Sequence, residues 1–338
     1  MTFIKKIRLL HFRNFERVDF SFKPGINQIV GENGVGKSNL LEALCLFSIG
    51  RSFRTLNLSQ LIQNEKKSFH IDIAFEKDGI DQQLSLSFKD GKRVMRHNST
   101  EFKGFSHLLG ILPSVIYSPY DLKLIEDSPK FRRQFLNIHI AQSDPLYIRH
   151  LSRYSKVLLQ RNALLKAKTL NAIEIWEGEL AKSSSYLMNK RRQAVNDLSQ
   201  LMQKEYQFLS QKNENPSISY NPSLTNTPEP YLWANSREKE LQYGYTLIGP
   251  HRDNFKIQLS NQEAKSFASE GQKRTLIAAL KLSENKRLDN PFLAIDDFSA
   301  HLDQNRRSLL MKQVSHHKQI FLTTPEKLPI SSHIIHLS

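Results

Sequence analysis

The chain has very little cysteine, a shortage of acidic residues and no long apolar run. Its one cysteine, Cys45, cannot form a disulfide within the chain, so we expect a reducing cytoplasmic location. Its neighbours Leu44 and Leu46 favour a buried helical position over a nucleophilic role. No uncharged apolar run approaches membrane-spanning length, and basic residues interrupt the N-terminal stretch FIKKIRLLHFRNF, which excludes a signal-peptide core. The sequence therefore predicts a cytoplasmic protein with no membrane partner.

The charge balance is strongly basic. Lysine and arginine number 48 and aspartate and glutamate 33, which gives a formal net charge of +15 over 338 residues. An extended polyanion would bind such a surface through counterion release, which favours a nucleic acid as the partner. Attraction to an anionic membrane or simple solubility are the alternative uses of this charge.

The pattern of apolar residues changes along the chain. Strand-like segments occupy the N-terminal part, including SFHIDIAF and QLSLSF on either side of the turn KDGI. A helical pattern runs from about Pro129 to Gln211, with breaks at Asp144-Pro145 and near Thr169. The stretch NENPSISYNPSLTNTPEP is a loop or linker candidate. An α/β ATPase core interrupted by a largely helical insertion is the simplest fold class for this order.

A glycine-rich loop carries the first chemical signal. Residues Gly31–Ser38, GENGVGKS, match G-x-x-x-x-G-K-[ST] between an apolar strand and a helix. In such a loop backbone N–H groups face the phosphates, Lys37 reaches the β and γ phosphates, and Ser38 ligates Mg²⁺. An accidental glycine turn is the alternative, which both flanking elements disfavour. The predicted ATP contacts are Gly31, Glu32, Asn33, Gly34, Val35, Gly36, Lys37, Ser38 and Asn39.

A second signal is the apolar segment PFLAIDD, which ends in two carboxylates. A buried strand accepts acidic residues only at its exposed end, and the ligand crevice of an α/β sheet lies at the carboxyl ends of its strands. We expect Asp296 to join the Mg²⁺ shell and Asp297 to orient or activate the attacking water. The alternative is that both aspartates only cap the next element.

The segment FASEGQKRTLIAALKLSENKR predicts a helix that begins near Gly271. A helix start with the Ser269 hydroxyl and free N–H groups makes a second candidate anion site, although an ordinary N-cap explains the same residues.

Together these motifs resemble a known group of ATPases. Ser269-Glu270-Gly271-Gln272 resembles the signature of ABC-type ATPases, and IRLLHFRNF, GENGVGKSN and IDDFSAHLD resemble their SMC-like branch. The nearer resemblance is to the RecF family of bacterial DNA replication and recombinational repair proteins. It rests on GRSFRT, YSPYDLKLIEDSPKFRRQFL, YSKVLLQRNALLK, GPHRD and ASEGQKRTLIAALKL, which together extend to about Asp303.

The chain departs from the family pattern at three places. Ala300-His301 stands where a Ser-Glu pair is common, Tyr120 replaces an acidic residue, and Glu270 replaces a glutamine. These changes bear on fine contacts and on the hydrolysis rate. His301 is either a chemical group or, more simply, part of a substituted surface turn.

The resemblance implies an ABC-type P-loop head with two lobes. Residues 1–115 plus 288–338 would form the ATP-binding lobe, and residues 116–287 a largely helical lobe that carries the signature. ATP and Mg²⁺ would lie between the P-loop of one subunit and Ser269, Gly271 and Gln272 of another, with Asp303 nearby, in an ATP-dependent head-to-tail homodimer. The family further implies a weak DNA-dependent ATPase that clamps double-stranded DNA at gaps or single/double-strand junctions and acts with RecO and RecR.

Two other classes remain open at this point. One is a different SMC-like ATPase, such as a nuclease-associated or defence subunit, and the other is a transporter ATPase, which would show no nucleotide-dependent DNA affinity. The helical insertion is too short for long coiled-coil arms. Candidate DNA-facing clusters, each equally readable as a solvated face, are Lys92-Arg93-Arg96, Lys130-Arg132-Arg133, Arg149-Arg153-Arg161 and Lys190-Arg191-Arg192.

Overall fold

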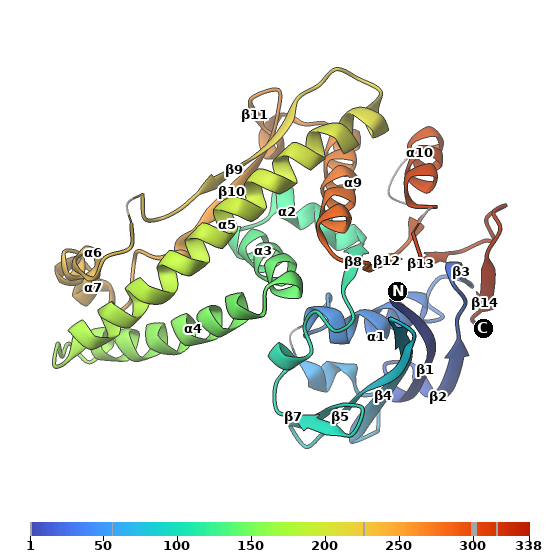
Figure 1. Ribbon diagram of the computed structural model, residues 1–338, viewed down its shortest axis with the longest axis horizontal. Coiled ribbons are helices and arrows are strands. Elements are labelled where there is room, and N and C mark those ends of the chain that lie inside the picture. Colours follow the sequence, from blue (N-terminus) through green and yellow to red (C-terminus); the bar gives the residue numbers. More distant parts are fainter. Residues whose placement is uncertain (1, 56, 226, 299–302, 316) are drawn as a thin grey trace. The chain divides into compact units, whose positions relative to one another are not determined.

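The computed structural model describes residues 2–338 except 56, 226, 299–302 and 316. The chain forms two compact units, whose elements are labelled in Figure 1. Unit 1 comprises Met1–Leu122, Glu205–Lys212 and Glu270–Ser338, and unit 2 comprises Lys123–Lys204 and Asn213–Ser269. The mixture of sheets and helices in unit 1 and the mainly helical unit 2 agree with the expected fold class.

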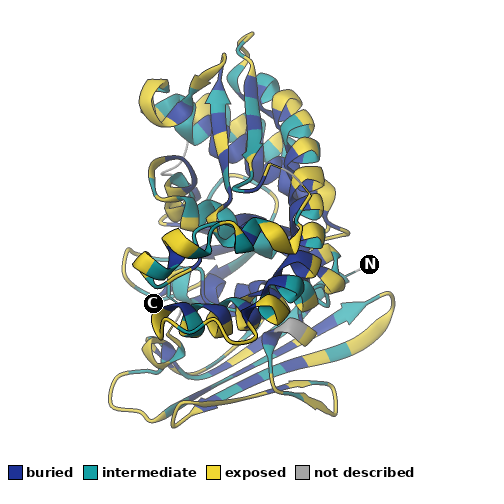
Figure 2. Ribbon diagram, turned by 90° about the vertical axis from the view of Figure 1, so that its left-hand side faces the viewer, coloured by how far each residue is buried: buried dark blue, intermediate teal, exposed yellow. Residues whose placement is uncertain are grey.

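Unit 1 contains an antiparallel sheet of six strands in the order β2-β1-β4-β5-β6-β7. Tight turns join several of them: Asp78-Gly79 and Asp90-Gly91 all have positive φ, as a type I′ hairpin turn requires. Buried residues alternate with partly or fully exposed ones along much of β4 and β5, which Figure 2 shows as bands. The strands are β1 (Thr2–Phe12), β2 (Phe15–Ser21), β4 (Ser68–Lys77), β5 (Ile80–Lys89), β6 (Lys92–His97) and β7 (Thr100–Phe102).

A second sheet in unit 1 is wholly parallel and has the strand order β14-β3-β13-β12-β8. The central strands β12 and β13 are buried at every position, as expected for a parallel sheet covered on both faces. Because the strands are parallel, their carboxyl ends meet at one edge. They are β3 (Gly25–Val30), β8 (Ser114–Tyr117), β12 (Phe292–Ile295), β13 (Gln319–Thr324) and β14 (His333–His336).

The helices of unit 1 include α1 (Lys37–Ile49), α9 (Glu270–Arg287) and α10 (Gln304–Val314), with the short helices η1 (Leu58–Leu61), η2 (Phe105–His107) and η3 (Pro119–Leu122). Helix α1 packs on β13 and β8 and is buried at every position from Leu40 to Ile49. A helix that other elements surround is expected to be apolar on all sides, and this stretch is apolar except for Glu42 and Ser48. Cys45 lies in this stretch, as expected, and burial raises the pKa of its thiol well above the usual value.

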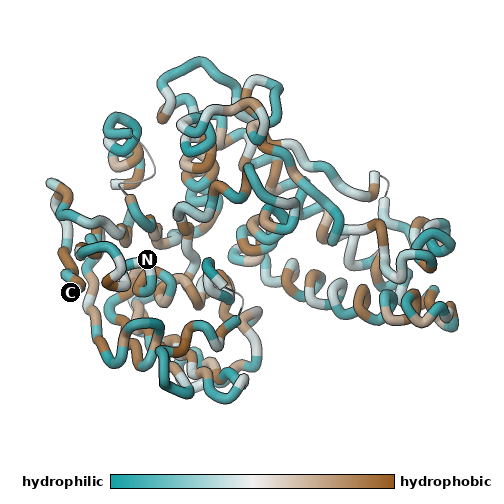
Figure 3. Tube along the Cα trace, turned by 180° about the vertical axis from the view of Figure 1, so that it is seen from behind, coloured by the Kyte–Doolittle hydropathy of each residue, from teal (hydrophilic) through white to brown (hydrophobic). Residues whose placement is uncertain are grey.

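Unit 2 is built mainly of α3 (Pro129–Ser143), α4 (Pro145–Lys166) and α5 (Ile173–Ser210), whose last residues belong to unit 1. Apolar and polar residues alternate around α4, at the lower right of Figure 3. The predicted break at Asp144-Pro145 is confirmed, because the Asp144 carboxylate caps α4 through the Leu146 and Tyr147 N–H groups. The smaller helices are α2 (Lys123–Glu126), α6 (Pro230–Ala234), α7 (Arg237–Tyr243), η4 (Pro250–Arg252) and α8 (Ala264–Phe267).

The expected loop between residues 213 and 230 is partly wrong. It contains β9 (Pro216–Asn221), which pairs antiparallel with β10 (Asn254–Leu259), and β11 (Gln262–Glu263) completes a three-stranded sheet. Strand β9 runs beside α5 (Figure 1), where the Ile218 N–H donates to Ser199 Oγ at 3.0 Å. Cross-strand pairing outweighs the turn-forming composition here, and Pro216 is tolerated as the first strand residue.

The two units also differ from the expected lobes in three segments. Residues 116–122, 205–212 and 270–287 pack with unit 1, whereas the sequence placed them in the helical lobe. Helix α9 packs on β8 of the parallel sheet, which accounts for most of the difference. The functional division into lobes stays a prediction. In the described part of the chain, no helix is long and apolar enough to cross a membrane.

Candidate nucleotide-binding site

The glycine-rich loop joins β3 to α1 in a conformation that its glycines make accessible. Gly34 and Gly36 have φ of +92° and +107°. A Cβ on Gly36 would lie 2.5 Å from Asn14 Nδ2, and one on Gly31 would lie 2.5 Å from the Leu337 carbonyl oxygen. Among the described residues no side chain caps the first turn of α1, and that turn contains no acidic residue. The first N–H groups of a helix have no partner within it and lie at the positive end of its dipole, as an anion site requires.

The structure brings the loop together with the first aspartate of the acidic strand end. Strand β12 lies one strand away from β3, with β13 between them, so Asp296 follows β12 at the same sheet edge as the loop. The Ser38 hydroxyl donates to Asp296 Oδ1 at 2.7 Å. The Lys37 ammonium folds back over the loop and donates to the Gly31 and Glu32 carbonyls at 2.6 and 2.7 Å. The loop hydroxyl is thus in contact with the carboxylate, and the cation is supplied by the preceding residue; their roles toward phosphate and Mg²⁺ stay predictions.

Thr323, which the sequence did not single out, forms hydrogen bonds with both aspartates. Thr323 lies near the end of β13, donates from Oγ1 to Asp296 Oδ1 at 2.9 Å, and accepts from the Asp297 N–H at 2.7 Å. Asp297 has φ of +54°, in the left-handed region. The available signal was the position of Thr323, the penultimate residue of the apolar segment QIFLTT, as Asp296 is the last of PFLAID. Polar residues near neighbouring strand ends of a parallel sheet meet at one edge.

Residues of the segments FRNF and GRSFRT form hydrogen bonds with the loop and with the first turn of α1. Asn14 donates to the Val35 carbonyl and accepts from Asn39 Nδ2, both at 2.8 Å, and Asn39 accepts from Arg54 at 2.7 Å. Asn39, predicted to contact ATP, therefore uses its side chain within this network. One turn further along α1, the fully buried Glu42 receives a bidentate pair from Arg13 at 2.9 and 2.8 Å.

The signature residues lie at the start of α9, with Ser269 immediately before it. A Cβ on Gly271 would be 3.3 Å from Arg306 Nη1, and the same guanidinium lies 3.1 Å from Asp303 Oδ2. Asp303 caps α10 by accepting from the Arg306 N–H at 2.9 Å. Arg306 thus pairs with Asp303 and lies close to Gly271, two of the residues predicted to contact ATP. Ala300, His301 and Leu302 lie outside the described residues, and Tyr120 is exposed in η3.

Two of the candidate DNA-facing arginines are wrongly assigned. Arg161 is fully buried between Glu177 and Glu240, and Arg191 is 2% exposed and pairs with Asp253. Arg132 and Arg133 also donate inward, to Asn254 Oδ1 and the Asp253 carbonyl. Spacing in a sequence does not show which face of a helix points inward. The cluster members that remain exposed are Lys92, Arg93, Arg96, Lys130, Arg149, Arg153 and Arg192.

The P-loop beside an acidic strand end, in a unit built from one parallel and one antiparallel sheet, defines an ATPase head of the ABC type. Residues 3–103 match the family model described as the RecF/RecN/SMC N terminal domain. The SMC head domain of Pyrococcus furiosus, 21% identical, shares the fold with a TM-score of 0.58 over 96% of this chain and 90% of that one.

More similar proteins narrow the class. The DNA replication and repair protein RecF of Protochlamydia amoebophila is 41% identical, over 96% of this chain and 94% of the relative. A solved structure of the recombination mediator protein RecF with ATP, described as part of the RecFOR pathway, superposes with a TM-score of 0.92 at 30% identity, over 99% of this chain and 95% of that one. The chain belongs to the RecF family.

Proposed function

We propose that the protein is an ATP-dependent DNA-binding protein of recombinational repair and replication. The observation that carries the ATP dependence is the 2.7 Å hydrogen bond from Ser38 to Asp296, which joins the phosphate loop to the acidic strand end. Family membership supports it, since the relatives are named for DNA replication and repair and one is solved with ATP. The excess of basic residues supports DNA as the partner.

The residues of the site fit ATP and Mg²⁺. The uncapped first turn of α1 and the left-handed glycines Gly34 and Gly36 form a cradle for phosphate, and Lys37 supplies a cation beside it. The Ser38 hydroxyl and the Asp296 carboxylate are oxygen ligands of the kind that Mg²⁺ prefers. Mg²⁺, when bound, would supply positive charge against the phosphates. Asp297 is assigned to orienting the attacking water and accepting its proton.

Two candidate anion sites on one chain suggest how ATP controls the binding of DNA. Ser269, Gly271 and Gln272 would contact the γ-phosphate of ATP held by a second subunit, so that ATP closes a head-to-tail dimer with two-fold symmetry. The closed dimer would hold double-stranded DNA at gaps or single/double-strand junctions. We further propose a weak DNA-dependent ATPase and cooperation with RecO and RecR, because a similar structure is described within the RecFOR pathway.

Two substitutions that push the dimer in opposite directions test this proposal. Asp297→Asn removes the carboxylate that handles the water proton, so turnover should fall by ~10²–10⁴-fold while ATP still binds. The closed dimer should then accumulate and release DNA more slowly in ATP. Lys37→Ala removes the cation at the phosphates and should neither dimerise nor retain DNA. ATPase rate and DNA dissociation, measured side by side, decide the matter. An Asp297→Asn protein with normal turnover, or with weaker ATP-dependent DNA retention than the parent, contradicts the assignment.

A further inference from the structure

Thr323 occupies a central place at the acidic strand end. It is 1% exposed and lies near the end of β13, which pairs with β12 on one side and with β3 on the other. These neighbours lead into the aspartate pair and into the phosphate loop respectively. A buried hydroxyl between two functional strand ends is well placed to act on both.

The direction of its hydrogen bonds is fixed by chemistry. An ionised carboxylate only accepts, so the Thr323 hydroxyl donates its proton to Asp296 Oδ1 at 2.9 Å. The Asp297 N–H only donates, so Thr323 Oγ1 accepts from it at 2.7 Å. One hydroxyl therefore uses its proton on the first aspartate and a lone pair on the second. Asp296 Oδ1 also accepts from Ser38, so hydroxyls from two distant segments of the chain fix the orientation of the Asp296 carboxylate.

The second of these bonds acts on a residue in an uncommon conformation. Asp297 has φ of +54°, in the left-handed region that non-glycine residues adopt uncommonly. Such conformations persist when surrounding contacts hold them, and the bond from the Asp297 N–H to Thr323 is one such contact. The next residue, Thr324, is equally buried, but its hydroxyl donates to the Glu326 carbonyl at 2.8 Å. The two adjacent threonines therefore differ in what their hydroxyls hold.

We propose that Thr323 is a positioning residue for the ATPase site. Its hydroxyl orients Asp296 for Mg²⁺ and keeps the Asp297 backbone in the left-handed conformation that directs its carboxylate. This inference rests on the proposed function, and it concerns a residue that contacts neither nucleotide nor metal in our assignment. Loss of such an outer partner commonly lowers metal affinity or activity by about 10–100-fold.

Three variants separate the hydroxyl from the packing around it. Thr323→Val keeps the shape and removes the hydroxyl, Thr323→Ser keeps the hydroxyl, and Thr324→Val makes the same change one residue away. Binding of a fluorescent ATP analogue is measured first in EDTA and then during a Mg²⁺ titration. Thr323→Val should bind the analogue in EDTA as the parent does, since Lys37 and the loop are intact. The Mg²⁺ concentration that gives half of the full change in analogue binding should rise about 10-fold in Thr323→Val. The kcat for ATP hydrolysis should fall about 10-fold or more.

The controls give each result a meaning. Thr323→Ser and Thr324→Val should both stay within about 2-fold of the parent in Mg²⁺ requirement. Thr323→Ser keeps a hydroxyl at position 323, and Thr324→Val removes only the hydroxyl that bonds the Glu326 carbonyl. Thr323→Ala, a smaller hydroxyl-free side chain, should repeat the change seen with valine, and it replaces Thr323→Val if that variant does not fold. A parental Mg²⁺ titration in both hydroxyl-free variants, or equal loss in Thr323→Ser, would overturn the inference while leaving the ATPase assignment intact. Absence of nucleotide binding by the parent would overturn both.

Discussion

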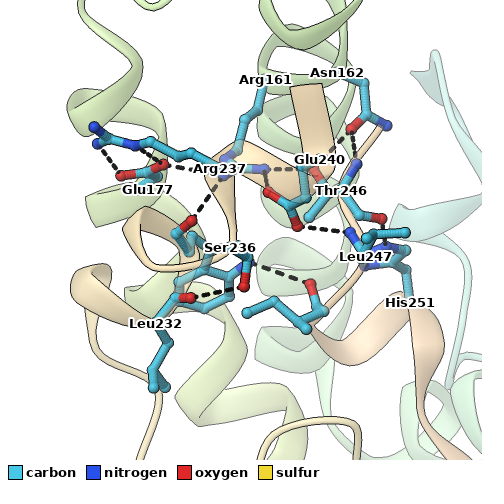
Figure 4. A network of polar contacts seen from close by, with 12 residues as sticks. Arg161, Asn162, Glu177, Leu232, Ser236, Arg237, Glu240, Thr246, Leu247 and His251 are labelled. Carbon is cyan, nitrogen blue, oxygen red and sulfur yellow. Dashed lines mark hydrogen bonds and ion pairs between the residues drawn. The ribbon is translucent and has the colours of Figure 1, made fainter. Parts of the chain in front are cut away.

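The buried cation Arg161 gives the sharpest prediction about what stabilises unit 2. Its guanidinium is fully buried and lies 3.0 Å from Glu177 and 2.7 Å from Glu240, with further bonds to Thr246 and to the Trp233 carbonyl (Figure 4). Arg161→Leu removes this charge from between two buried carboxylates. Because a buried charge without its partner is costly, the change should destabilise the unit strongly.

The size of the loss follows from what each carboxylate retains. Glu177 keeps Arg237, at 2.9 and 2.5 Å, so its charge stays compensated. Glu240 keeps only the Leu247 N–H, at 2.7 Å, among the contacts described for its carboxylate. We therefore expect Arg161→Leu to lower the free energy of unfolding by about 3–5 kcal/mol, mostly through Glu240. Adding Glu240→Gln removes that charge and keeps an acceptor for Leu247, so about 1–3 kcal/mol should return.

The assay can be confined to this unit, because both tryptophans of the chain, Trp176 and Trp233, belong to it. Urea unfolding followed by tryptophan fluorescence should show the midpoint of Arg161→Leu lowered by roughly 2 M, given typical slopes. The matched control is Lys182→Ala, which breaks a pair with Glu179 on a lysine that is 72% exposed, and it should cost under about 1 kcal/mol. An Arg161→Leu midpoint no lower than that of the control would refute the reasoning.

Two further predictions concern pH and assembly. Burial lowers the pKa of His251 to about 4, so the folded protein keeps this side chain neutral. Its Nε2–H donates to the Thr246 carbonyl. In the unfolded chain the same imidazole takes up a proton below about pH 6.5. Stability should therefore fall as the pH falls through this window, by about 2 kcal/mol between pH 7 and 5 in urea unfolding, and His251→Gln should lack that component; equal pH dependence in both proteins would contradict it. Ser269→Arg should leave ATP binding by the monomer intact and abolish ATP-driven dimerisation in sedimentation, since a bulky cation replaces the hydroxyl at the start of α9; a mutant that dimerises like the parent would disprove the shared ATP site.

The parts of the site that a sequence can predict are those whose chemistry depends on local order. The loop from Gly31 to Ser38 must follow a strand and precede a helix, and Asp296 must end a buried strand, so both positions could be predicted from flanking residues. Thr323 could not, because its role depends on β13 lying between β3 and β12, and strand order is a property of the whole sheet. Its contact with Asp296 spans 27 positions.

The sequence also did not show which of its charged side chains are buried. Arg161 and Arg191 sit in basic clusters and look like surface residues, yet each faces carboxylates supplied by segments far along the chain. Glu240 and Asp253 carry no mark that pairs them with these arginines. Strand β9 was missed for a related reason, since its partner β10 lies beyond α6 and α7. Non-local pairing decided all three outcomes.

The central claim is that ATP, held at the loop from Gly31 to Ser38, controls binding to DNA. The most direct test is a titration of the intact protein against gapped, duplex and single-stranded DNA, with and without ATP and Mg²⁺. We predict that ATP strengthens binding to gapped or duplex DNA, and that a footprint of ~6 phosphate contacts loses about a thousandfold in affinity between 50 and 200 mM salt. Equal affinity for all three DNAs with and without ATP would contradict the claim.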